Sequence, residues 1–204
     1  IAARQLTING NSSFTSNTAS TAATQAGFAQ GGALQIASTS LLAVTLSSVT
    51  CSSNRADFGA CAFISGSRVT LHIDTSTFNS NAVTANGGAL ALNVKTATIQ
   101  TSSFSANDAV RTHLRRRLAF VSLLRLLATG SGGAVRIDGT SDGSLYSISQ
   151  SQFTSNTGTS GQLHSVACQV LMQLWLAIAG GAVEAVSPGL SHGLTINQIG
   201  RAHV

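Results

Sequence analysis

The stretch FNSNAVTANGGALAL, Phe78 to Leu92, decides the fold because both of its halves return along the chain. It opens with Phe-x-x-Asn, and nine positions after the Phe comes Gly-Gly-Ala followed by an apolar residue. Neither half contains an acidic, basic, thiol or imidazole group, so the repetition points to structure rather than to chemistry. Internal self-similarity at a fixed period is typical of folds that stack one unit upon the next.

Three short elements recur in the same order about five times. Phe-x-x-Asn begins at Phe14, Phe78, Phe104 and Phe153, and a fifth copy begins at Cys51. The Gly-Gly-Ala element begins at Gly31, Gly87, Gly132 and Gly180, with a degenerate copy at Gly59. An alternating triplet precedes each Phe or Cys, beginning at Leu6, Val44, Leu71, Ala97 and Tyr146.

Alternation within these elements predicts strands. Leu90 and Leu92 lie on one side of the chain and Ala91 on the other, which is the period of a half-buried strand. The repeat therefore predicts two inward columns, one of such apolar pairs and one of the Phe or Cys residues. It also predicts a variable outward column: Gln35, Phe63, Ala91, Arg136 and Glu184. Such short strands bury their inner faces only when successive units stack.

The asparagines and glycines have structural roles in this interpretation. Asparagine tolerates the left-handed backbone of a turn, and stacked asparagines pass side-chain amide hydrogen bonds along a ladder. The paired glycines let the chain turn a tight corner. We expect an all-β solenoid of about five coils, each with three short strands. Its corner asparagines are Asn17, Asn54, Asn81, Asn107 and Asn156.

The paired elements resemble the repeat of the polymorphic outer-membrane protein family, the chlamydial surface autotransporters. Similar repeats occur in many right-handed parallel β-helix proteins with a pectin lyase-like fold. The resemblance implies a right-handed parallel β-helix over residues 1–198, acting as a surface-displayed or secreted module. It further implies a structural and adhesive role, with a cell-surface protein or a glycan as partner. We interpret the chain as an internal fragment adjoining further repeats, because it begins without Met and shows no signal peptide.

Two inserts, at about 110–130 and 161–179, interrupt the repeat just before Gly-Gly. Phe104 and Gly132 are 28 positions apart, against nine for the intact copy at Phe78. Both inserts are expected to leave the coil. They are interpreted either as translated introns retained in the sequence or as natural loops, and the first could instead be a basic amphipathic helix. Neither is expected to insert into a membrane. Residues 199–204 do not continue the sixth unit and are interpreted as a non-native tail.

The positive charge does not belong to the repeat. Five of the 11 Lys and Arg residues lie in the first insert and a sixth in the tail. The rest of the chain then carries five basic residues against six acidic ones. A nucleic-acid partner is therefore not expected, although the isoelectric point is near 10.1.

The cysteines and histidines give no metal-site pattern. Cys51 replaces an inward Phe, and alternation directs Cys61 toward the corner or the outside. We favour a buried thiol at Cys51 and keep a disulfide between Cys51 and Cys61 as the alternative. Three cysteines without paired spacing, and scattered histidines, predict no metal site.

A polysaccharide lyase or hydrolase is the alternative function. Such enzymes need clustered carboxylates, but the six acidic residues fall at different repeat positions, with only Asp138 and Asp142 near neighbours. We therefore expect no enzyme and no catalytic, cofactor-binding or metal-binding residues, and no cofactor. Ice binding is a further functional hypothesis, because one outward column is rich in threonine: Thr7, Thr45, His72, Thr98, Ser147 and Thr195. Stacking of threonine side chains between neighbouring strands explains this column equally well. Asn11-Ser12-Ser13 is a lone N-glycosylation sequon, in keeping with secretion.

Overall fold

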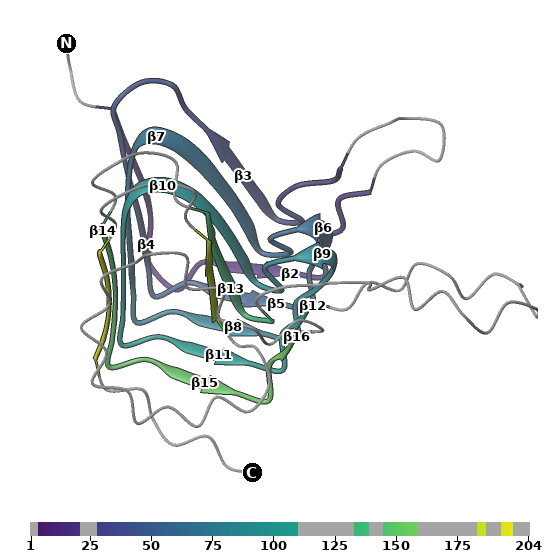
Figure 1. Ribbon diagram of the computed structural model, residues 1–204. Coiled ribbons are helices and arrows are strands. Elements are labelled where there is room, and N and C mark those ends of the chain that lie inside the picture. The colour runs from purple at the N-terminus through teal and green to yellow at the C-terminus, as the bar shows by residue number, and fades with distance from the viewer. Residues whose placement is uncertain are drawn as a thin grey trace, which may run out of the picture.

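The computed structural model describes residues 4–20, 28–109, 133–138 and 145–158, and the backbone alone of 183–186 and 193–197. These residues form 18 β-strands and no helix. Accordingly, the part of the chain that is described offers no helix able to cross a membrane. All the strand pairings between described strands are parallel. The protein is therefore an all-β structure of parallel sheets (Figure 1).

The strands form three sheets. Sheet 1 has nine strands: β1 (Arg4–Ile8), β3 (Leu34–Ala37), β4 (Leu42–Ser47), β7 (Ala62–Asp74), β10 (Leu90–Gln100), β13 (Val135–Asp138), β14 (Leu145–Ser149), β17 (Val183–Val186) and β18 (Gly193–Asn197). Sheet 2 has five: β2 (Ser13–Thr15), β5 (Thr50–Ser52), β8 (Thr77–Asn79), β11 (Ser103–Ser105) and β15 (Gln152–Thr154). Sheet 3 has four: β6 (Arg55–Phe58), β9 (Ala82–Asn86), β12 (Asp108–Ala109) and β16 (Thr157–Gly158).

Successive strands along the chain belong to the three sheets in a fixed order. The chain passes from sheet 1 to sheet 2, then to sheet 3, and returns to sheet 1 beside the strand it left, as β4, β5, β6 and β7 do. We call each such passage a unit. The strands of successive units lie side by side in all three sheets (Figure 1), so the prediction of stacked parallel strands is confirmed. This arrangement is compatible with the predicted β-helix.

The unit of β7, β8 and β9 has three strands, as predicted, but the residues that form them differ from the three predicted elements. The strands of sheet 3 follow Asn54, Asn81, Asn107 and Asn156, in residues that belong to none of the three predicted elements. In addition, β7 and β10 each run without interruption from the Gly-Gly-Ala element into the next apolar triplet. A long strand forms there because the linking residues, such as Asn93 and Val94, pair in register with the preceding unit.

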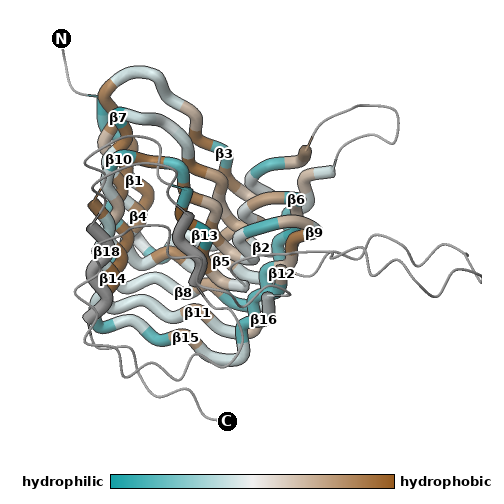
Figure 2. The backbone as a smooth tube through the Cα atoms, in the orientation of Figure 1, coloured by the Kyte–Doolittle hydropathy of each residue, from teal (hydrophilic) through white to brown (hydrophobic). Residues whose placement is uncertain are grey.

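The interior consists of the predicted apolar columns. In the described units, Ile64, Leu90, Leu92 and Ile137 are at most 1% exposed, and their partners align in register. The triplet column is buried from β4 to β14, whereas Leu6 and Ile8 in β1 are half-buried, and Ala97 is followed in register by the larger Tyr146. In Figure 2, β7 and β10 carry brown apolar stretches, whereas the strands of sheet 2 are mostly white or teal. Removal of this apolar surface from water stabilises the stack.

The left-handed corners lie one residue away from the position we predicted. The backbone φ is positive at the residue before each ladder asparagine rather than at the asparagine: Ser16, Ser53, Ser80, Ala106 and Ser155. The first glycine of the Gly-Gly pair behaves as expected, with φ of +70° at Gly87. The second, Gly88, is required by stacking, because an added Cβ would lie 1.9 Å from the carbonyl oxygen of Gly133. The two glycines thus serve different purposes, one within the unit and one between units.

The predicted inserts at about 110–130 and 161–179 and the predicted tail at 199–204 lie outside the described residues. The repeat returns to its register after the first insert, since Val135 and Ile137 pair with Leu90 and Leu92.

Candidate functional site

The most regular exposed surface of the described units is the outer side of sheet 2. Each strand of this sheet is a triplet whose central Phe or Cys points inward, so the two flanking residues point outward. All ten flanking residues are uncharged and polar. We call them the polar face: Ser13, Thr15, Thr50, Ser52, Thr77, Asn79, Ser103, Ser105, Gln152 and Thr154.

The polar face is two columns wide and five strands long. Parallel strands lie about 4.8 Å apart, and residues i and i+2 of one strand about 6.6 Å apart. Some side chains bond across strands: Thr15 and Ser52 hydroxyls are 3.3 Å apart, and Ser105 Oγ donates to Asn79 Oδ1 at 3.2 Å. The face therefore presents hydroxyl and amide groups at fixed, repeated spacings.

The predicted asparagine ladder borders one end of every strand in the polar face. Each Nδ2 donates to Oδ1 of the asparagine in the next unit at 2.9–3.0 Å, from Asn17 through Asn54, Asn81 and Asn107 to Asn156. Each Oδ1 from Asn54 onward also accepts the backbone N–H of the preceding asparagine, at 2.9–3.1 Å. From Asn54 onward, each Nδ2 also donates backward to the Phe or Cys carbonyl of the preceding unit, at 2.9–3.0 Å. The middle asparagines therefore use all four side-chain hydrogen-bonding positions.

A serine ladder that we did not predict borders the other end. Ser76 Oγ accepts the Val49 N–H at 3.1 Å, and Ser102 and Ser151 accept the N–H of the serine one unit earlier. Each of these hydroxyls donates to the carbonyl two residues before it, at 2.7–2.8 Å. The sequence carried a signal, because a serine stands two positions before Phe in four of the five copies. Both ends of the face are thus fixed by buried hydrogen bonds.

The Phe column lies directly beneath the polar face. The rings of Phe78, Phe104 and Phe153 stack with centroids 4.6 and 4.8 Å apart and interplanar angles of 7° and 3°. Phe14 and Cys51 continue the column in register. Parallel rings, two ladders and in-register strands together restrict movement of the face.

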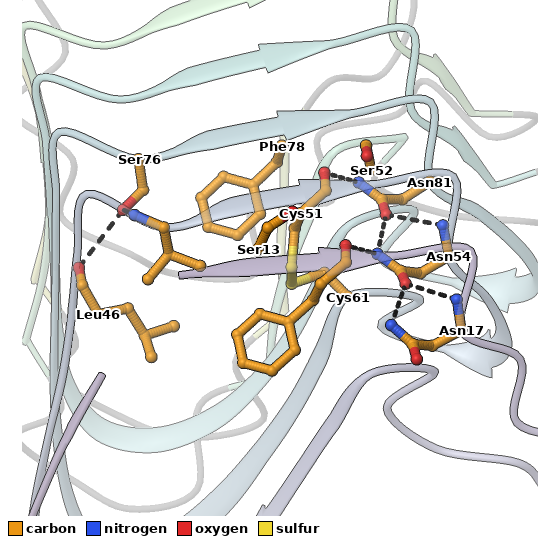
Figure 3. Close-up of a disulfide and its surroundings, with 12 residues drawn as sticks. Ser13, Asn17, Leu46, Cys51, Ser52, Asn54, Cys61, Ser76, Phe78 and Asn81 are labelled. Atoms are coloured by element: carbon orange, nitrogen blue, oxygen red, sulfur yellow. Dashed lines mark hydrogen bonds between the residues drawn. A yellow bond between two sulfur atoms is a disulfide. The ribbon is translucent and has the colours of Figure 1, made fainter. Parts of the chain in front are cut away.

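A disulfide occupies the column where Phe is missing. Cys51 and Cys61 are bonded, with Cα atoms 5.8 Å apart, and their residues are 0% and 2% exposed (Figure 3). Our preference for a buried thiol was wrong, and Cys61 points into the interior rather than toward the corner or the outside. Alternation failed because the left-handed Gly59 bends the chain just before Cys61 and turns that side chain inward. The Cys61 sulfur then helps fill the space that a Phe ring would occupy at position 51.

The predicted variable column is aligned but only partly accessible. Pairing places Gln35, Phe63, Ala91, Arg136 and Glu184 in register. Gln35 is exposed, but Ala91 is only 3% exposed because it is short and lies between the longer Phe63 and Arg136. The Arg136 side chain also forms an ion pair with Asp138 at 2.9 Å. This column is a less open surface than we expected.

The threonine-rich column exists as a register column. Thr7, Thr45, His72, Thr98, Ser147 and Thr195 pair one after another across sheet 1. His72 interrupts the threonines, and the adjoining column mixes Gln5, Ala43, Thr70, Thr96 and Leu145. This surface is less uniform in chemistry than the polar face.

The described acidic side chains lie apart. Asp57 accepts the Ala29 N–H at 2.9 Å and also bonds the Thr84 hydroxyl, and Asp138 pairs with Arg136. Burial raises the pKa of Asp108, whose Oδ1 has no hydrogen-bond partner among the described residues. No group of three His, Cys, Asp or Glu residues suited to a metal occurs in the described ranges. Asp142 is not among the described residues, and only the backbone of Glu184 is described.

No family model matches the chain, and the searches of curated proteins and of solved structures found nothing similar to it.

Proposed function

We propose that the chain is part of a right-handed parallel β-helix that is secreted or displayed at a cell surface, with a structural and adhesive role. The proposal joins the repeat resemblance to one structural observation, the ordered polar face of sheet 2. Ten outward residues there are free of any role in the apolar core, and buried ladders and stacked rings support them from beneath. Groups held rigid before contact lose little entropy on binding, which favours recognition.

The chemistry of the polar face favours a neutral partner. Its Ser, Thr, Asn and Gln residues donate and accept hydrogen bonds but carry no charge, so they cannot neutralise a polyanion. The hydroxyl groups of a neutral glycan match these donors and acceptors along a repeating chain. We therefore favour a glycan over a surface protein as the partner.

The disulfide supports an extracellular location. Disulfides form and persist in secretory and extracellular compartments and are rare in the reducing cytosol. Cys51 stands at the position of Phe in the other units, and Cys61 stands at the position of Ala. The disulfide therefore joins two positions that are otherwise apolar.

A binding assay with paired variants tests the proposal. Thr50→Lys/Thr77→Lys places two cations on neighbouring strands of the polar face, where these residues pair in register. Ala43→Lys/Thr70→Lys is the matched control, because these exposed residues pair between the same two units on sheet 1. Both proteins are first compared by circular dichroism, and then with the unmodified chain on an array of neutral and acidic polysaccharides and on intact cells.

We expect the unmodified chain to bind neutral glycans, the first variant to lose binding at least tenfold, and the control to retain it. Equal binding by both variants would exclude the polar face as the contact surface. Calcium-dependent release of unsaturated or reducing sugars from pectins would contradict the adhesive proposal and favour a polysaccharide lyase.

A further inference from the structure

The sequon Asn11-Ser12-Ser13 lies at the corner between β1 and β2, in the first unit. Asn11 is exposed, and around the adjacent Gly10 an added Cβ would meet no atom within 4 Å. Ser12 Oγ donates to the Asn9 carbonyl at 2.6 Å, and the Ser13 hydroxyl lies 3.1 Å from that of Thr15. The neighbourhood of the Asn11 side chain is therefore open to solvent.

Asn11 differs chemically from the asparagines of the ladder. Asn54, Asn81 and Asn107 are fully buried, and their amide groups donate and accept hydrogen bonds between units. Within the described part of the chain, by contrast, the Asn11 amide has no hydrogen-bond partner. Its Nδ2 is therefore accessible to a modifying enzyme.

The backbone does not require asparagine at this corner. Asn11 has a φ of 61°, and asparagine is enriched in this left-handed region. The equivalent corners of the later units adopt φ of 48–56° with other residues: Ser48, Thr75, Thr101 and Gln150. Conformation alone therefore does not explain the choice of asparagine in the first unit.

We propose that Asn11 is a site of N-linked glycosylation, an inference that rests on the secretory route of the proposed function. The donor is a lipid-linked oligosaccharide pyrophosphate, and the catalyst is the oligosaccharide transferase of the secretory pathway. Nδ2 forms a bond to the anomeric carbon of the sugar and loses one proton, while the bond from that carbon to the pyrophosphate breaks and the lipid pyrophosphate leaves. The hydroxyl of Ser13 completes the acceptor sequence.

The experiment expresses the full chain behind an added cleavable signal peptide in eukaryotic cells, and collects both medium and microsomes. Treatment with a peptide-N-glycosidase, followed by peptide mass spectrometry, reads the occupancy of Asn11. Asn11→Gln and Ser13→Ala should both abolish the modification. Ser13→Thr, which keeps the hydroxyl in the same place, should retain it, and this result separates a sequon effect from a folding effect.

Unmodified Asn11 in chains whose Cys51–Cys61 disulfide has formed would overturn the proposal. This outcome is distinct from failure of the proposed function, because the added signal peptide directs entry into the pathway. The location of the natural protein is measured separately, by fractionation of the source cells, and adhesion is measured on deglycosylated protein.

Discussion

Asn81→Ala should destabilise the protein several times more than Asn17→Ala, although both remove an asparagine of the same ladder. The Asn81 side chain accepts two hydrogen bonds from Asn54 and donates to the Cys51 carbonyl and to Asn107 Oδ1, at 2.9–3.1 Å. Asn81 is 0% exposed, so no water replaces these partners. At about 1 kcal/mol for each net hydrogen bond, the loss is about 4 kcal/mol.

Asn17 is the matched control because it lies at the exposed end of the ladder. Its side chain makes one hydrogen bond to Asn54, through Nδ2 at 3.0 Å, and its backbone N–H contact survives substitution by alanine. Water can also replace the lost amide. The expected loss is therefore below about 1 kcal/mol.

Urea unfolding followed by far-UV circular dichroism measures both losses, and amide hydrogen exchange locates them. Asn81→Ala should speed exchange at Asn54, whose N–H loses its acceptor, more than at Ser103 in sheet 2. Equal losses for the two variants would refute the view that buried ladder bonds hold the units together. An Asn81→Ala protein that does not fold would agree with the large loss, provided that Asn17→Ala folds.

Asn81→Asp adds a pH test with a defined sign. The carboxylate keeps an acceptor for Asn54 but places a second oxygen against the Cys51 carbonyl and Asn107 Oδ1, which are both acceptors. Burial and repulsion raise the pKa of this carboxyl in the folded state. The folded state then binds more protons than the unfolded state, so the variant should gain stability as the pH falls and lose it toward neutrality. A stability difference from the unmodified chain that does not change with pH would contradict this.

Three further predictions concern other parts of the chain. Cys51→Ser/Cys61→Ser should lower the free energy of unfolding by about 2.5 kcal/mol, because the disulfide closes a loop with a sequence separation of 10. Urea unfolding with and without reductant measures this loss, and an unchanged urea midpoint would contradict the prediction. Asp108→Asn should raise the urea midpoint at neutral pH, since burial raises the pKa of Asp108 and its ionisation destabilises the fold as the pH rises. The gain in stability should vanish in acid, where Asp108 is protonated, and a gain that persists there would contradict this cause. Deletion of 111–129 restores the nine-position spacing between Phe and Gly-Gly and should leave the circular dichroism of the β-strands intact, whereas loss of folding would make this segment part of the structure.

The sequence by itself determined the inward columns of the repeat and how the units align. The Phe or Cys column, the apolar pairs and the asparagines recur at fixed offsets, and every described member is found in its predicted register. Repetition makes this possible because a residue that stacks on its own counterpart meets the same environment in each unit. The polar character of the sheet 2 face can be read in the same way, from the residues on either side of Phe.

Tertiary structure alone decided the features that depend on the corners. A left-handed residue before each Asn, and another at Gly59, changes the direction of the chain, so alternation no longer predicts where the next side chain points. For this reason Cys61 faces inward and bonds Cys51, and the strands of sheet 3 form in residues to which the repeat assigned no element. The exposure of Ala91 likewise depends on the lengths of Phe63 and Arg136 in the neighbouring units, which are 28 and 45 positions away in the sequence and become adjacent only when the units stack.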